Sequence, residues 1–79
     1  MTDGKELERV VRDSGITITH IADKMGCSRN RVYSILAGSE CVASEIVTLT
    51  EILHLTKAQR DGIFLPENVT KNHTTEQAD

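Results

Sequence analysis

Apolar side chains recur along most of the chain at the spacing of helices rather than of strands. Leu7, Val10 and Val11 form the first stripe, and charged residues flank it. Thr2 or Asp3 can cap a helix that carries this stripe. Four later segments show the same spacing, and the helices that they predict span 18–25, 28–37, 43–54 and 57–64.

This periodicity stops at Pro66, and the residues beyond it are polar. A polar segment of this kind buries too little apolar surface to pack into a core. We therefore expect one all-α domain over residues 1–66 and a disordered polar tail over 67–79.

The composition limits the classes of protein further. Of the 79 residues, 38% are hydrophobic but only Tyr33 and Phe64 are aromatic, so the expected core is aliphatic. No run approaches the roughly 20 apolar residues of a membrane span, and residues 1–6 lack the basic-then-apolar order of a signal peptide. We therefore expect a cytoplasmic protein with no membrane partner, in which Cys27 and Cys41 are reduced.

Charge is distributed unevenly along the chain, whose net charge is −3. Residues 1–38 carry six basic and five acidic side chains, whereas residues 39–79 carry three basic and seven acidic ones. An anionic ligand is therefore expected to meet the first part of the chain.

The segment that joins the second and third predicted helices is the most informative. Each helix is about two turns long, and residues 25–28 leave room only for a tight turn between them. Gly26 tolerates the left-handed backbone that such a reversal needs, and Ser28 can cap the next helix at once. This is the layout of a helix-turn-helix, whose second helix enters the major groove of DNA.

The outer face of the third predicted helix suits DNA. Helical spacing places Val32, Ile35 and Leu36 inside. The outer face of this helix then consists of Arg29, Asn30, Arg31, Tyr33, Ser34 and Ala37. None of these residues is acidic. Arg29 and Asn30 fall in the first turn, and these residue types bind guanine and adenine in bidentate fashion, so we expect this helix to read bases.

Two stretches of sequence carry a family resemblance. The run Ala22-Asp23-Lys24-Met25-Gly26 and the frame Val32…Ile35-Leu36-x-Gly38 resemble the DNA-binding domain of lambda-type phage repressors and Cro proteins. The resemblance covers about residues 5–65 and is most specific over 17–38. It implies a compact five-helix bundle that regulates transcription as a homodimer on a pseudo-palindromic double-stranded DNA operator.

The resemblance also implies roles for single residues. Arg29, Asn30 and Ser34 occupy positions where the family reads bases. Ile18 stands where the family commonly has a phosphate-binding Gln, so the hydroxyl of Thr17 or Thr19 is expected to replace it. The remaining expected phosphate contacts are Lys24, Arg31 and Tyr33. Lys24 has the alternative role of a plain surface charge, and Tyr33 that of a half-buried core aromatic.

Ile63, Phe64 and Leu65 are three consecutive apolar residues near the end of the predicted domain. Only one side of a helix can face the core, so we expect them to form a dimer seam, with ordinary core as the alternative. A dimer would bring two recognition helices to half-sites about one DNA turn apart.

Other chemistries find less support in the sequence. The potential zinc ligands of the chain are His20, His54, His73, Cys27 and Cys41. They are not spaced in the close pairs that structural zinc sites use. No catalytic pair or cofactor motif stands out, so we expect no enzyme, no metal and no cofactor.

The alternative function is a protein-binding module of the same fold. Such a module would act as an antirepressor or antitoxin and bind a phage repressor or another regulatory protein. The pI near 5.5 favours this alternative. So does Glu40, which stands where the family often has basic or Asn residues.

Overall fold

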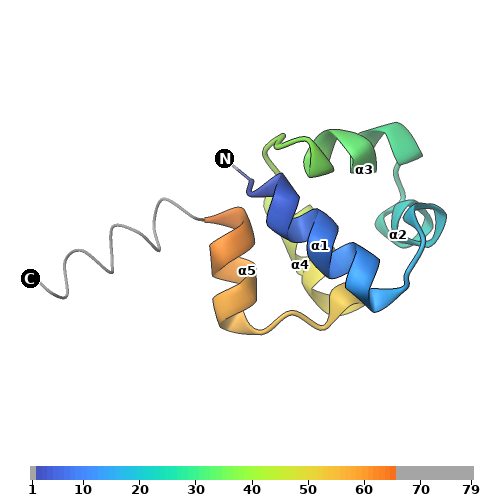
Figure 1. Cartoon of the computed structure of the whole chain (residues 1–79). Helices are drawn as coiled ribbons and strands as arrows, with labels where there is room; N and C mark the ends of the chain where they lie inside the picture. The colour runs from blue at the N-terminus through green and yellow to red at the C-terminus, as the bar shows by residue number, and fades with distance from the viewer. Residues whose placement is uncertain (1, 66–79) are drawn as a thin grey trace, which may run out of the picture.

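Short turns connect five helices in the part of the chain that the structure describes (Figure 1). The computed structural model describes residues 2–65, and within this range there is no strand. The predicted tail over 67–79 lies outside the described residues. The helices are α1 (Gly4–Ser14), α2 (Ile18–Met25), α3 (Arg29–Leu36), α4 (Ala43–Leu53) and α5 (Lys57–Phe64). The all-α prediction is confirmed for these residues.

Side-chain caps fix where four of these helices begin. Each cap oxygen accepts a hydrogen bond from the backbone N–H three residues later. These caps are Asp3, Thr17, Ser28 and Thr56. Asp3 rather than Thr2 caps α1, since the Asp3 carboxylate accepts the Glu6 N–H at 3.2 Å. The fourth helix ends one residue earlier than expected, because His54 adopts a left-handed backbone with φ 54°.

One aliphatic core joins the helices. Each helix contributes one fully buried side chain to it, and these are Leu7, Ile21, Ile35, Leu49 and Ile63. α1 packs against α3, α4 and α5, while α2 packs against α3 and α4, and α4 against α5. α3 therefore packs its backbone against α1 and α2, and within residues 2–65 no other helix approaches its backbone closely.

The start of α1 fixes the end of α3. The backbone N–H of Asp3 donates to the carbonyl of Ile63 at 2.6 Å, which ties the N-cap of α1 to α5. Gly4 lies against the carbonyl of Leu36, and a Cβ at Gly4 would stand 2.0 Å from that oxygen. Only glycine permits this approach, so α1 locks the C-terminal end of α3 in place.

The expected dimer seam requires a correction. Ile63 is fully buried and Phe64 is 6% exposed, and both lie in the core that α5 shares with α1 and α4. A partner cannot reach them without opening this core, so they are core residues. Leu65 is 45% exposed and is the one residue of the three that is available to a partner.

Candidate functional site

Backbone hydrogen bonds close the turn between α2 and α3. Gly26 is left-handed with φ 70°, and its N–H donates to the carbonyl of Asp23 at 3.2 Å. The N–H of Cys27 donates to the carbonyl of Ala22 at 3.0 Å, which completes a Schellman motif. Because Ser28 then caps α3, this helix starts at Arg29, only three residues after Gly26.

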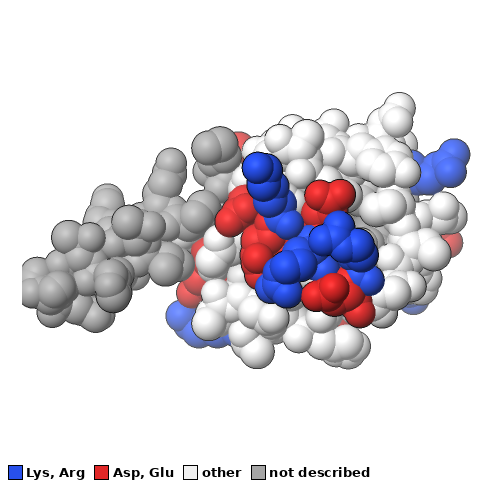
Figure 2. Space-filling model, in the orientation of Figure 1, with Lys and Arg blue, Asp and Glu red and all other residues white. Residues whose placement is uncertain are grey.

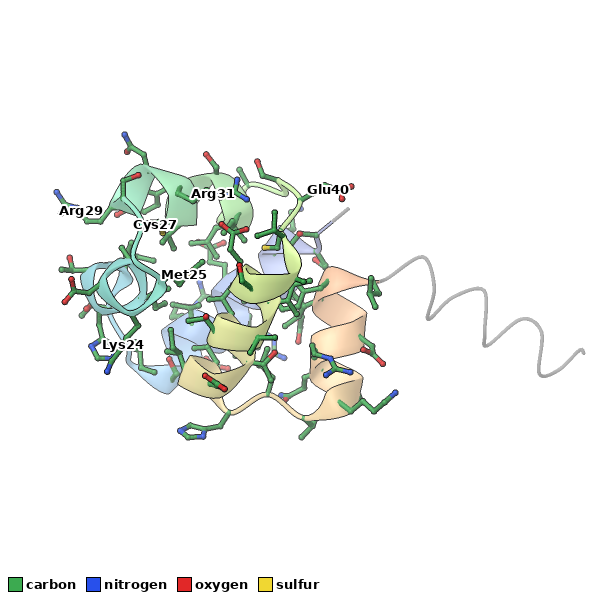
Figure 3. All side chains as sticks on the ribbon, turned by 180° about the vertical axis from the view of Figure 1, so that it is seen from behind. Lys24, Met25, Cys27, Arg29, Arg31 and Glu40 are labelled. Atoms are coloured by element: carbon green, nitrogen blue, oxygen red, sulfur yellow. The ribbon has the colours of Figure 1, made fainter. Side chains whose placement is uncertain are left out.

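α3 presents a polar face to solvent, as the sequence predicts. Val32 and Ile35 are buried, whereas Arg29, Asn30 and Ser34 are exposed. Tyr33 is 54% exposed, so it is not a core aromatic. Arg29 forms no ion pair with any residue of the described chain, and Figure 3 shows it projecting from the start of α3.

Arg31 belongs to the same helix but is held within the protein. Its Nε donates to Glu45 Oε2 at 2.9 Å and its Nη2 to Glu45 Oε1 at 2.8 Å. The same Nη2 donates to the backbone carbonyl of Glu40 at 2.9 Å. Arg31 would therefore have to break a two-point ion pair in order to reach a phosphate.

This pairing shifts both ionisation equilibria. The hydrogen bonds from Arg31 hold the pKa of the Glu45 carboxyl below its ordinary value, against the opposing effect of burial. The same bonds raise the pKa of the Arg31 guanidinium. Only 17% of the Glu45 side chain and 33% of the Arg31 side chain are exposed, so solvent screens the pair less than it screens a pair on the open surface.

Lys24 lies apart from the exposed face of α3. Figure 3 shows it projecting on the other side of α2 from Arg29. There it lines a polar cleft of about 440 Å³ between α2 and α4. The other lining residues are His20, Thr48, Glu51, Ile52 and His54. The sequence places these residues far apart, and their spacing gives no sign that they meet.

The two threonines at the start of α2 are exposed, as their expected role requires. Thr17 accepts the His20 N–H in its capping role, which leaves its hydroxyl proton available to a ligand. Thr19 forms no hydrogen bond through its side chain with residues 2–65.

The surface charge does not form a basic patch on the face that α1 occupies. Figure 2 shows Lys and Arg interspersed with Asp and Glu there, while the edge over α3 is mostly uncharged. Arg9 is paired with Glu6 and with Asp13, all on α1. The mixed charges of α1 make it a poor platform for a polyanion.

The His, Cys, Asp and Glu side chains of residues 2–65 are the groups that could bind a metal ion, and the two cysteines are the thiols. No group of three His, Cys, Asp or Glu side chains within 2–65 is arranged to hold a metal ion, and His73 lies outside this range. Cys27 and Cys41 are free and half-buried. Burial raises the pKa of Cys41, which keeps it in the less reactive thiol form.

Sequence reasoning missed the importance of Glu45. The Val42 side chain has no oxygen, so the Glu45 carboxylate caps α4 by accepting the Val42 N–H at 3.0 Å. An acid three residues into a helix is a known capping signal, and it could have been used to find this contact. No such signal predicts the partner Arg31, which lies 14 residues away in sequence.

No family model, no curated protein and no solved structure matches the chain. The geometry described above is therefore the basis for the function proposed below. None of the helices within residues 2–65 has the length and apolar character needed to cross a bilayer.

Proposed function

We propose that this chain is a sequence-specific regulator of transcription that binds double-stranded DNA, of the lambda-type repressor and Cro kind. One observation carries the proposal: α3, which contains no acid, exposes Arg29, Asn30 and Ser34 directly after a tight turn from α2. α3 would lie in the major groove and read base edges, and the bound protein would block access to a promoter.

The dimensions support this docking. An α-helix with its side chains is about 10–12 Å across, so α3 fits within the major groove, which is about 12 Å wide. α3 packs against α1 and α2 and meets α4 through the Arg31–Glu45 pair, while Arg29, Asn30 and Ser34 stay exposed, so these three can enter the groove. The positive end of the helix dipole adds a favourable interaction with nearby phosphates.

The hydroxyls of Thr17, Thr19 and Tyr33 would donate to phosphates on either side of the groove. A homodimer would place two copies of α3 on the half-sites of a palindromic operator. Leu65 supplies an exposed apolar contact for such a dimer, in place of the buried Ile63 and Phe64.

The test is selection of bound duplexes from a random pool, at low salt and at near-physiological salt. The proposal predicts a two-fold symmetric motif whose half-sites lie about 10 base pairs apart. Binding that disappears at the higher salt without enriching a motif would reject sequence-specific recognition, because only the phosphate contribution would then exist.

A second candidate function is a protein-binding modulator, such as an antirepressor or antitoxin of the same fold. The observation that favours it is the scarcity of cations beside α3: Arg31 is paired with Glu45, and Lys24 lies across α2. Purification from the native host in a one-to-one complex with another regulator would support this candidate. A stable dimer that binds its operator unaided would count against it.

A further inference from the structure

α3 and α4 do not approach each other closely along their backbones anywhere in residues 2–65. The Arg31–Glu45 ion pair nevertheless joins them, through two hydrogen bonds of 2.8 and 2.9 Å. A third bond, from Arg31 to the carbonyl of Glu40, fastens the connection between the two helices. A planar guanidinium that meets a carboxylate at two points fixes the angle as well as the distance between the groups.

Glu45 is itself held in place by α4. Its Oε1 accepts the Val42 N–H at 3.0 Å, so the carboxylate belongs to the first turn of α4 as a cap. A carboxylate that is fixed in this way is a firm anchor for Arg31, because it has little rotational freedom left to lose.

The two ends of α3 are secured differently. The C-terminal end is locked by Gly4 against the Leu36 carbonyl. The first turn, which carries Arg29 and Asn30, follows the turn from α2 and has its polar restraint at Arg31. Any rocking of α3 about its locked end displaces the first turn most, and Arg31 opposes that displacement.

We propose that Arg31 is a positioning residue, which together with Glu45 sets the orientation of the exposed face of α3 and thereby its sequence preference, without touching DNA itself. The inference rests on the proposed function for its effect on DNA. It assigns Arg31 a role different from the phosphate contact that the family resemblance implies.

Three variants separate the two roles of Arg31: Arg31→Gln, Glu45→Gln and the double variant. Gln at position 45 keeps an oxygen that can accept the Val42 N–H, so Glu45→Gln loses the ion pair while the cap is retained. Affinity for the selected operator is measured over a range of salt concentrations. Arg9→Gln breaks an exposed ion pair on α1 and is the matched control.

A positioning role predicts that both single variants lose affinity for the operator by about tenfold, comparable with weakening one base contact. The double variant should lose no more than either single variant, and the dependence on salt should stay as in the wild type. A phosphate contact predicts instead that Arg31→Gln lowers the salt slope by about one, while Glu45→Gln leaves affinity unchanged or raises it. That second pattern would overturn the inference.

A further control excludes general loss of stability. Leu55→Ala removes buried apolar surface in the connection between α4 and α5, and should lower the melting temperature without changing the preferred motif. If Leu55→Ala and Arg31→Gln change the motif equally, Arg31 is merely structural and the inference fails.

A measurement without DNA separates this inference from the proposed function. Residual dipolar couplings in free protein report the orientation of α3 relative to α4. The inference predicts a changed or averaged orientation in Arg31→Gln and Glu45→Gln, and wild-type couplings in Arg9→Gln. Unchanged orientation in both α3–α4 variants would overturn it, whereas changed orientation in a protein that binds no duplex would reject only the proposed function.

Discussion

Arg29 and Arg31 lie two residues apart on the same short helix, yet they occupy different surroundings. Arg29 projects into solvent from the first turn of α3 and has no ion-pair partner in residues 2–65 (Figure 3). Arg31 points back toward α4, where it holds Glu45 at two points. The comparison shows that residues on the polar side of one helix divide into those free to meet a ligand and those used by the protein itself.

The largest effect is expected from a change at Gly4, whose contact with the Leu36 carbonyl holds the C-terminal end of α3. Gly4→Ala would place a Cβ 2.0 Å from the Leu36 carbonyl oxygen, so α1 and the end of α3 must separate. We expect a loss of at least about 1–3 kcal/mol in the free energy of unfolding, measured by chemical denaturation. Gly62→Ala in α5 is the control, since nothing lies within 4 Å of its Cβ, and a gain of about 0.5–1 kcal/mol is expected there. Equal effects of the two changes would contradict the close approach at Gly4.

The second prediction concerns Arg29 itself. Arg29→Ala should weaken binding to the selected operator by about 1–3 kcal/mol, or about 5- to 150-fold, and relax the preference at one base pair of each half-site. Fluorescence anisotropy with the selected duplex and single-base variants measures both effects. Arg9→Ala on α1 should change neither. An unaltered base preference in Arg29→Ala would remove Arg29 from the set of base-reading residues.

The third prediction uses acid to weaken the restraint on Arg31. The pKa of Glu45 is lower in the folded protein than its ordinary value, chiefly because Arg31 donates to its carboxylate. Its contribution to stability is therefore complete above the ordinary pKa of a Glu side chain and is lost as the pH falls through the lower pKa of the folded state. The melting temperature of wild type should exceed that of Glu45→Gln near neutral pH, and the difference should shrink in that acidic window.

Glu6 and Asp61, whose pKa values are also lowered, are present in both proteins, so their effects cancel. A difference that is constant with pH would show that ionisation of Glu45 does not matter.

The smallest effect is expected at Lys24. Because it lies across α2 from Arg29 and lines the cleft with His20 and His54, Lys24→Ala should change operator affinity by less than about twofold and leave the salt slope as it is. Titrations at several salt concentrations provide the measurement. A slope that falls by about one would restore Lys24 as a phosphate contact rather than a plain surface charge.

Local signals predicted most of the helices. Thr17, Ser28 and Thr56 cap them where the sequence places a hydroxyl before an apolar stripe, and Gly26 reverses the chain where expected. These contacts link residues a few positions apart, so spacing alone specifies them. The exposed residues of α3 were predictable for the same reason, since burial of Val32 and Ile35 fixes which side faces outward.

Long-range contacts explain what the sequence could not predict. Arg31 meets Glu45 across 14 residues, and Ile63 enters a core formed by helices from the whole domain. A helical wheel separates apolar from polar sides but does not show which polar side chain finds a distant partner. Nor does it show how many sides of α5 are covered, so the sequence alone favours a dimer seam for Ile63 and Phe64, which the fold buries.

The most direct test of the account follows backbone amide chemical shifts of isotope-labelled protein while the selected duplex is added at near-physiological salt. The account predicts that the largest changes map to the start of α2 and to residues 28–37, with Arg29 and Asn30 foremost and the α2–α4 cleft little affected. Changes concentrated at the cleft or on α4 and α5, with α3 unaffected, would contradict the claim that the exposed face of α3 meets DNA.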